Sequence, residues 1–339
     1  MAKSHLQLKV LDLDLKSRFT LSGAAATKKT TLLACWHDGI GEGSPSIHYG
    51  LTADQLLDSL LSPAKDEIEL STDKDLLELL QQLPQKLNVA RCALEMAYLD
   101  YQAKLQARPL YNFLGLPKPQ RVESSLTISN GTDREISEQI ERAADFNTLK
   151  LKVGFDGDLS FIDKVLALRE VKLRLDANGG WHVDQAVERL KSLSGYPIEF
   201  VEQPLITPDL FDLDQIKSRV DVPLFLDESI IAENDIHEYQ YVIDGVNLKA
   251  AKCGGLQNTI AMARLAREYG LQLLLGCMIE TAIGITAALH IASLFDCYDL
   301  DALLLTANDP FRGAYFEGCK LLLPERKGIG VEYDDDIFA

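Results

Sequence analysis

Short apolar runs that end in charged residues recur through the middle of the chain, at residues 149–153, 173–178, 200–204, 225–229 and 246–249. The charged ends of these runs follow one another at intervals of 24, 26, 25 and 22 residues, at Lys152, Asp176, Glu202, Asp227 and Lys249. A short strand, a helix and two loops together need about 20 to 30 residues, and the segments between the runs have the apolar spacing of amphipathic helices. The pattern therefore predicts successive βα units.

The beginning of the chain has a different pattern. Residues 6–16 and 30–37 are predicted to be strands, and the Asp-Gly pair at 38–39 predicts a turn into another short strand. From residue 52 to about residue 114 the apolar spacing is helical. Strands followed by helices predict an α+β module in place of alternating βα units.

Two prolines within residues 116–119 mark a domain boundary, because a helix cannot continue through them. Beyond it, residues 122–128 are predicted to be the first strand of a barrel, residues 271–276 a strand buried on both faces, and residues 298–305 the last strand. In a closed α/β barrel of the TIM type, the carboxyl ends of the strands converge on one mouth, where such barrels carry their chemistry. The charged ends would then face one cavity.

Composition and charge exclude several classes of function. The chain has 339 residues, of which 47% are hydrophobic and 25% charged, and its formal net charge is −17. This charge argues against a nucleic-acid or anionic-membrane partner. The six cysteines form no CxxC pair, which favours buried free thiols in a reducing compartment. We find no run of about 20 apolar residues and no signal-peptide pattern, so we expect a cytoplasmic protein.

Three acidic residues at consecutive predicted strand ends are candidate metal ligands: Asp176, Glu202 and Asp227. Carboxylate oxygens are the ligands that Mg²⁺ prefers in proteins. Any one of these residues could instead cap the helix that follows it or form a salt bridge. Three carboxylates at matched strand ends favour a magnesium site.

Two lysines on one predicted strand, Lys150 and Lys152, point the same way because they are two residues apart. Burial of two ammonium groups is costly unless a site uses them, and their proximity should lower one pKa toward neutrality, as a general base requires. Lys249 projects from a strand across the barrel, and Lys252 competes with it for a second acid/base role. Lys249 is favoured because it ends the strand, whereas Lys252 precedes the glycines at 254–255, where the loop turns into a helix. Lysines that face each other across a metal-bound carboxylate predict removal of a proton from one face of a carbon and its return to the other, through an enediolate that the metal stabilises.

These motifs together resemble the muconate-lactonizing branch of the enolase superfamily. The resemblance rests on the Lys-x-Lys pair, on RLDAN, VEQP and LDES around the three acids, and on NLKAAKCGG around Lys249. It implies a (β/α)7β modified TIM barrel at 119–307 and an α+β capping domain at 1–118, completed by 308–339. It also implies Mg²⁺ at Asp176, Glu202 and Asp227, acid/base catalysis by Lys152 and Lys249, and tuning of Lys152 by Lys150.

Within that branch, the Asp299-Leu300-Asp301 run resembles the Asp-x-Asp motif of dipeptide epimerases of the L-Ala-D/L-Glu type. Two carboxylates at the far side of the mouth would bind the free α-ammonium group of a substrate. Residues 276–281 also fit the epimerase pattern, which makes Met278 and Glu280 candidate substrate-binding residues. Glu280 could hydrogen-bond near Lys249 or be a buried structural acid.

One departure concerns the side chain of the substrate. Glutamate-specific relatives place an arginine in the first flexible loop, where this chain has small residues at 22–26, and no arginine occurs between Arg18 and Arg91. Ala24 in this loop is therefore a further candidate substrate-binding residue. Lys28 or Lys29 could replace the arginine. The preferred dipeptide is left open, because a hydrophobic or small side chain fits the sequence equally well.

The sequence therefore predicts a Mg²⁺-dependent dipeptide epimerase that inverts the α-carbon of the C-terminal residue. Its partner is a small dipeptide, and a homo-oligomer is possible. The alternatives on the same fold are an o-succinylbenzoate synthase, a muconate cycloisomerase or an N-acylamino acid racemase, and a non-enzymatic ligand-binding barrel is a further alternative. The synthase and cycloisomerase substrates lack an ammonium group, so Asp299 and Asp301 argue against those two activities.

Overall fold

The first part of the computed structural model, which describes residues 6–21, 24–46, 50–61 and 70–338, is a small antiparallel sheet. Its strands pair in the order β1 (Leu6–Leu21), β2 (Ala24–Trp36) and β3 (Gly39–Gly43). The three predicted strands are confirmed, as is the turn between β2 and β3. Both strands of the first hairpin are longer than predicted, and residues 24–26 belong to β2, where they pair with the end of β1.

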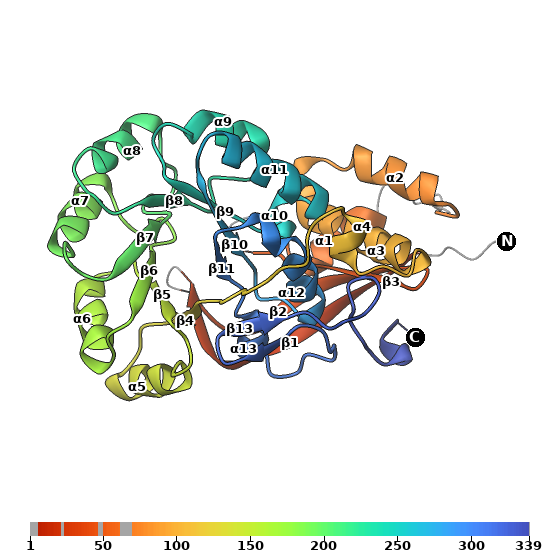
Figure 1. The fold of residues 1–339 in the computed structure, drawn as a ribbon, viewed down its shortest axis with the longest axis horizontal. Coiled ribbons are helices and arrows are strands. Elements are labelled where there is room, and N and C mark those ends of the chain that lie inside the picture. Colours follow the sequence, from red (N-terminus) through yellow and green to blue (C-terminus); the bar gives the residue numbers. More distant parts are fainter. Residues whose placement is uncertain (1–5, 22–23, 47–49, 62–69, 339) are drawn as a thin grey trace.

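The predicted helical region after the sheet is also confirmed in its described part, and residues 62–69 of the prediction lie outside the described residues. It contains α1 (Ala53–Leu61), α2 (Asp73–Gln82), η2 (Gln85–Leu87), α3 (Asn88–Leu105) and α4 (Leu110–Phe113). The longest of these helices, α3, packs against β3 and β2 and lies between the small sheet and the rest of the molecule (Figure 1). We call β1–β3 and α1–α4 the cap.

Eight parallel strands form the barrel, and its sheet runs in sequence order from β4 to β11. The strands are β4 (Leu126–Ile128), β5 (Thr148–Lys152), β6 (Lys172–Asp176), β7 (Ile198–Glu202), β8 (Leu224–Leu226), β9 (Gly245–Leu248), β10 (Gln272–Gly276) and β11 (Cys297–Asp299). A bridge between Ser124 and Tyr298 joins the two ends of the sheet. The (β/α)7β barrel of the α/β class, with an additional antiparallel sheet, is thereby confirmed.

Helices follow the first seven barrel strands and lie outside them (Figure 1). They are α5 (Asp133–Arg142), α6 (Asp158–Leu168), α7 (Val183–Ser192), α8 (Leu210–Lys217), α9 (Glu233–Tyr239), α10 (Ala250–Cys253) with α11 (Leu256–Glu268), and α12 (Ala282–Ile291), which is followed by η3 (Ala292–Leu294). The start of α5 shows how the sequence fixes a boundary. Thr132 and Glu135 form a capping box there, which satisfies amide groups that have no partner within the helix.

Two predicted strands differ from the structure. The first barrel strand covers only the end of residues 122–128, and the last ends at Asp299, because Ala302–Leu305 form the short helix α13. An apolar run of this length fits a strand or a helix equally well by periodicity, and alanine and leucine are strong helix formers. Asp301 therefore begins a helix, and the prediction that it lies on the last strand is wrong.

The C-terminal segment returns to the cap. It contains β12 (Tyr315–Glu317), β13 (Lys320–Leu322) and η4 (Asp335–Phe338). The carbonyl oxygen of Ile337 accepts a hydrogen bond from Lys9 on β1, at 2.5 Å. One buried apolar cluster includes Leu33 and Met96 from the cap together with Leu248 and Ile283 from the barrel. The predicted domain limits at 118/119 and 307/308 stay predictions, because the cap and the barrel share this core.

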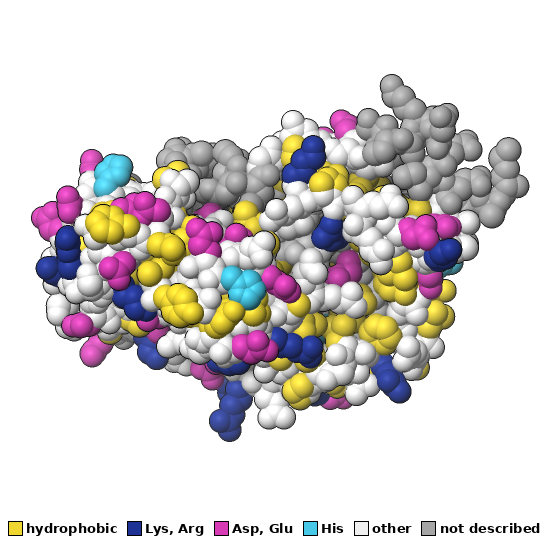
Figure 2. All heavy atoms as spheres, turned by 90° about the horizontal axis from the view of Figure 1, so that it is seen from above, with side chains coloured by type: hydrophobic (Ala, Val, Ile, Leu, Met, Phe, Trp, Pro, Cys, Tyr) yellow, Lys and Arg dark blue, Asp and Glu magenta, His cyan; other side chains and the backbone are white. Residues whose placement is uncertain are grey.

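The surface carries charges of both signs. Figure 2 shows acidic, basic and hydrophobic side chains interspersed on the face seen from above. Among the described residues, no helix combines the length and the apolar character that crossing a membrane requires.

Candidate active site

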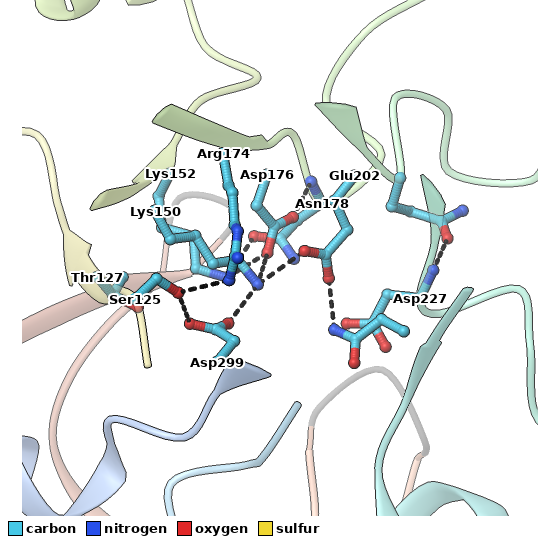
Figure 3. Close-up of polar contacts among 12 residues, drawn as sticks. Ser125, Thr127, Lys150, Lys152, Arg174, Asp176, Asn178, Glu202, Asp227 and Asp299 are labelled. Atoms are coloured by element: carbon cyan, nitrogen blue, oxygen red, sulfur yellow. Dashed lines mark hydrogen bonds and ion pairs between the residues drawn. The ribbon is translucent and has the colours of Figure 1, made fainter. Parts of the chain in front are cut away.

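Four of the predicted strand-end residues lie together at the carboxyl end of the barrel: Lys152, Asp176, Glu202 and Asp227 (Figure 3). Lys152 on β5 pairs with Asp176 on β6, and Asp176 pairs with Glu202 on β7. Because parallel neighbours in register present their side chains to the same face, these three side chains enter one mouth. Asp227 directly follows β8, and Lys249 directly follows β9. The three predicted metal-binding carboxylates are at most 1% exposed.

Lys150 lies at the centre of the cluster. Its ammonium group is 2.9 Å from Asp176, 2.9 Å from Glu202 and 2.7 Å from Asp299. Burial opposes the charge of Lys150, but these carboxylates outweigh it and raise its pKa well above the ordinary value. Lys150 thus joins two predicted metal ligands to one predicted substrate-binding residue.

The two predicted acid/base lysines flank this centre, and each contacts a carboxylate. The Lys152 Nζ donates to Asp176 at 2.7 Å and to Asn178 at 3.2 Å. The Lys249 Nζ donates to Asp227 at 2.5 Å. The side chains of Lys152 and Lys249 are 16% and 12% exposed, so their ammonium groups lie at the boundary between the buried cluster and the pocket.

The pKa of Lys150 and the pKa of Lys249 are both raised, whereas one pKa of the Lys150 and Lys152 pair was expected to fall. For Lys249, burial and the Lys150 ammonium group both lower the pKa, but Asp227, Glu202 and Glu228 together outweigh them and the pKa is raised. The prediction considered the repulsion between cations and omitted the carboxylate that each lysine contacts. A neighbouring carboxylate favours the charged ammonium form over the neutral amine that a base requires.

Lys252 has a different environment from Lys249. Its side chain is fully buried, and its Nζ donates to the Asp227 carboxylate at 2.6 Å and also to the Asp227 carbonyl oxygen. Lys249 lines the pocket, whereas Lys252 is absent from the pocket lining. The geometry favours Lys249 over Lys252 for the second acid/base role, and Lys252 positions Asp227.

The acidic residues differ strongly in proton affinity. Burial raises the pKa of Asp176, but Lys150 and Lys152 outweigh it and hold that pKa well below its ordinary value. Lys249 and Lys252 likewise hold the pKa of Asp227 well below its ordinary value. For Glu202, burial and the neighbouring Asp176 prevail over Lys150, and its pKa rises to about 7.

The chemistry of these three carboxylates suits a hard divalent cation. All their donor atoms are oxygens, and Glu202 Oε2 is buried beside the Lys150 ammonium group, at 2.9 Å. Asn247 on β9 donates to the other oxygen, Oε1, at 2.7 Å and thereby fixes the orientation of the carboxylate. The described side chains contain no group of three or more His, Cys, Asp or Glu already arranged to hold a metal ion, since each carboxylate is turned toward a lysine.

The predicted ammonium-binding residues lie across the mouth from the carboxylates. Asp299 ends β11 and accepts a hydrogen bond from the Ser125 hydroxyl at 2.8 Å. Asp301 accepts one from the Thr127 amide at 2.7 Å. Burial and the neighbouring Asp299 raise the pKa of Asp301 to about 6. Both carboxylates line the pocket and can face one cation.

The remaining predicted substrate contacts lie in different places. Met278 lines the pocket. Glu280 accepts a hydrogen bond from the Met278 amide at 3.3 Å, and burial together with Glu42 on the cap raises its pKa to about 8. This environment favours the structural interpretation of Glu280. Ala24 begins β2 opposite Leu21, and its side chain lies outside the described part of the structure, so its contact with substrate stays a prediction.

One pocket joins the mouth of the barrel to the cap. Its lining residues are Lys29, Ser46, Thr127, Lys150, Lys152, Glu228, Lys249, Cys277, Met278, Ile279, Asp299, Asp301 and Leu305. Three further residues, which the sequence analysis did not identify, contact residues at the carboxyl end of the barrel. Ser125 and Asn247 orient Asp299 and Glu202, and Arg174 on β6 donates to the Tyr298 carbonyl oxygen at 2.7 Å. The period of two along a strand is the signal that could have found Asn247 and Arg174, which precede Lys249 and Asp176 by two residues.

Comparison with known proteins gives concordant results. Residues 135–337 match the family described as Enolase C-terminal domain-like. A hydrophobic dipeptide epimerase from a Flavobacteria bacterium is 31% identical over 96% of this chain and 97% of its own length. An L-Ala-D/L-Glu epimerase from Bacteroides thetaiotaomicron is 31% identical over 86% of this chain and 77% of its own length.

A solved structure shows the same fold over nearly the whole chain. It is a dipeptide epimerase from Cytophaga hutchinsonii complexed with Mg and the dipeptide D-Ala-L-Val, with a TM-score of 0.88, 27% identity and coverage of 98% of this chain and 96% of that chain. The matched family covers more than half of the chain, and the two relatives, aligned over most of their length, agree with it. The chain therefore belongs to the enolase C-terminal domain-like family and, within it, to the isomerases of the dipeptide epimerase group.

Proposed function

We propose that this chain is a Mg²⁺-dependent dipeptide epimerase that inverts the α-carbon of the C-terminal residue of a dipeptide by two-lysine proton transfer. The observation that carries the proposal is the position of Lys152 and Lys249. They lie at the ends of β5 and β9, which are four strands apart in an eight-stranded barrel and hence on opposite sides of its axis. Both line the same pocket.

Opposed lysines suit inversion at one carbon. A substrate carbon between them has one ammonium or amine group on each face. The uncharged lysine removes the α-proton, and the charged lysine delivers a proton to the opposite face of the enediolate. Because the two lysines exchange protonation states in each turnover, the reaction runs in both directions.

The buried carboxylates supply the site for the metal. Asp176, Glu202 and Asp227 would hold Mg²⁺, which stabilises negative charge on the substrate carboxylate and so makes the α-proton more acidic. Lys150 neutralises part of the charge of Asp176 and Glu202, at 2.9 Å from each. The Mg complex of the Cytophaga hutchinsonii relative supports this choice of ion.

The second pair of acids selects the substrate class. Asp299 and Asp301 face the pocket together, and a free α-ammonium group is the cation that a dipeptide offers them. This pair distinguishes the proposed reaction from eliminations and cycloisomerisations, whose substrates carry no ammonium group. The cytoplasmic location and the homo-oligomer stay predictions.

The test is a mixed dipeptide library incubated with the protein and Mg²⁺ in deuterium oxide. Mass spectrometry should detect one added mass unit in each dipeptide that reacts, and chromatography should detect the epimer with the inverted C-terminal residue. Lys152→Ala and Lys249→Ala should each abolish epimerisation. If Mg²⁺ binds and no dipeptide exchanges or epimerises, the proposal is wrong.

A further inference from the structure

Two adjacent lysines of β2 point to opposite sides of the cap sheet. In the antiparallel register, Lys29 is opposite Leu13 and Lys28 is opposite Asp14. Leu13 is fully buried, and directly opposite residues share a face of the sheet. Lys29 therefore points toward the covered face, together with Thr31 and Leu33, which are also fully buried.

Lys28 has the environment of an ordinary surface lysine. Its side chain is 72% exposed, and its ammonium group is 3.4 Å from Asp14, which is itself 51% exposed. Because successive side chains of a strand point to opposite faces, Lys28 points away from the pocket that Lys29 lines. Lys28 therefore offers a matched control, since it has the same residue type, the same strand and the adjacent position.

Lys29 has the opposite environment. Its side chain is half-buried and lines the pocket at the mouth of the barrel. Its Nζ donates to the Pro45 carbonyl oxygen at 3.0 Å. Within the described residues no carboxylate is paired with this ammonium group, and burial lowers its pKa. A partly desolvated cation without an anionic partner gains stability from any anion that reaches it.

The segment that holds Lys29 is attached to the barrel. The Ser44 hydroxyl donates to the Ile279 carbonyl oxygen at 2.6 Å, and Ser46 and Ile279 line the pocket together with Lys29. The ammonium group of Lys29 is thus held at the junction between the cap and the barrel loop. A fixed cation is a better selector of ligands than a mobile one, because less side-chain entropy is lost on binding.

The other lysines of the pocket are already paired. Lys150 contacts Asp176, Glu202 and Asp299, Lys152 contacts Asp176, and Lys249 contacts Asp227, all within 2.9 Å. Among the pocket lysines, all of which the structure describes, Lys29 differs because it contacts a carbonyl oxygen instead. An additional negative charge on the substrate therefore finds its favourable partner at Lys29.

We propose that Lys29 is a specificity-determining residue that binds an anionic side chain of the dipeptide, so that this enzyme prefers substrates with a carboxylate side chain. The inference rests on the proposed epimerase function and names the substrate class of the same site. One relative described above is named for hydrophobic dipeptides and another for L-Ala-D/L-Glu. Sequence similarity alone therefore does not distinguish between these substrate classes.

The test compares isosteric substrates that differ only in charge. The value of kcat/KM is measured for L-Ala-L-Glu against L-Ala-L-Gln, and for L-Glu-L-Ala against L-Gln-L-Ala. A charge-assisted hydrogen bond should give the wild type a preference of about 10- to 100-fold for glutamate at one of the two positions. Lys29→Met should reduce that ratio to about 1, Lys29→Arg should retain most of it, and Lys28→Met should leave it unchanged.

Because the readout is a ratio on one protein, a partly unstable variant still reports on the preference. Equal turnover of the charged and neutral substrates by the wild type would overturn the role of Lys29 and leave the epimerase function intact. A preference that persists in Lys29→Met, or that disappears in Lys28→Met, would also overturn it. If no dipeptide reacts or exchanges its α-proton, the proposed function fails and this inference fails with it.

Discussion

At the scale of single residues, the site is a set of paired opposite charges in which almost every ion has more than one contact. Lys150 contacts three carboxylates, and Asp227 contacts Lys249 and Lys252. Removal of one partner from a buried pair leaves an uncompensated charge, which is costly. Substitutions at the periphery of the network, such as Asp301, therefore report on individual roles more clearly than substitutions at its centre.

Asp301→Asn tests the ammonium site. Wild-type enzyme should prefer a free dipeptide over its N-acetylated form, and loss of one carboxylate from the site should reduce that preference by about 10-fold, the value of one charge-assisted hydrogen bond. The measurement is kcat/KM for the two substrates. Asp156→Asn, at a fully exposed position, is the control. An unchanged preference in Asp301→Asn would remove Asp301 from the substrate site.

His290 makes folding stability depend on pH. Its ring is buried, Nδ1 accepts from the Tyr111 amide at 3.1 Å, and Nε2 therefore donates to the Ile329 carbonyl oxygen at 2.9 Å. Burial lowers its pKa to about 4 from the ordinary 6.5. Above pH 6.5 the ring is neutral in both the folded and the unfolded chain. Below pH 6.5 the unfolded chain takes up a proton and the folded chain does not, so stability falls until the pH reaches about 4.

The expected loss from this residue is about 2 kcal/mol between pH 7.5 and pH 5. His290→Gln keeps one donor and one acceptor without the titration, so its unfolding free energy should fall by about 2 kcal/mol less over the same range. Chemical unfolding at the two pH values measures the difference. Identical pH dependence in the two proteins would show that His290 does not resist protonation.

At the scale of elements, β3 lies directly on the backbone of α3. A Cβ atom at Gly39, Gly41 or Gly43 would come within 2.0 to 2.1 Å of the carbonyl oxygen of Ala97, Ala93 or Val89. Alternate residues of a strand share a face, and residues four apart in a helix share a side, so the glycines of β3 match one stripe of α3. No larger residue fits this contact.

Gly41→Ala should therefore lower the unfolding free energy by about 3 kcal/mol, because strand and helix must separate to admit the methyl group. Gly195→Ala is the comparison. Its added Cβ meets no atom within 4 Å, but φ is +88°, so only backbone strain of about 1 kcal/mol is expected. Equal losses in the two variants would show that close packing does not restrict β3.

The sequence predicted the strands from β5 to β9 and the helices between them. The signal was a charged residue at the end of each strand, repeated at a regular interval. The prediction failed at α13, where four apolar residues carry no periodic signal. It also ranked Lys252 below Lys249 without showing what Lys252 contacts, and it left Ser125 unassigned. These roles depend on partners 25 and 174 residues away in the chain, and no local pattern encodes such contacts.

At the scale of the whole molecule, two carboxyl groups of the cap bind the beginnings of two barrel helices. Glu42 on β3 accepts from the Thr281 hydroxyl at 2.6 Å and from the Gly284 amide at 3.0 Å, at the start of α12. Glu95 on α3 accepts from the Leu256 amide at 2.5 Å, at the start of α11. Acidic groups at helix N-termini are stabilising, and these contacts fix the cap over the pocket that both parts line.

Binding of Mg²⁺ should stabilise the whole molecule. At a free concentration 100 times its dissociation constant, the ion should add about 2.7 kcal/mol to the unfolding free energy, and a chelator should reverse the effect. Thermal unfolding with and without Mg²⁺, at constant ionic strength, measures the shift. Glu202→Gln is the matched control and should show little shift. An equal shift in the two proteins would place the ion outside the three carboxylates.

The central claim is that Lys152 and Lys249 act on opposite faces of one substrate carbon. Nuclear magnetic resonance can follow the α-proton of the C-terminal residue of L,L- and L,D-dipeptides in deuterium oxide, with Lys152→Ala and Lys249→Ala. Neither variant should epimerise, and each should exchange the α-proton of one diastereomer without inversion, with the opposite diastereomer exchanged by the other variant. If both variants exchange the same diastereomer, or if either still epimerises, the two lysines do not work from opposite faces.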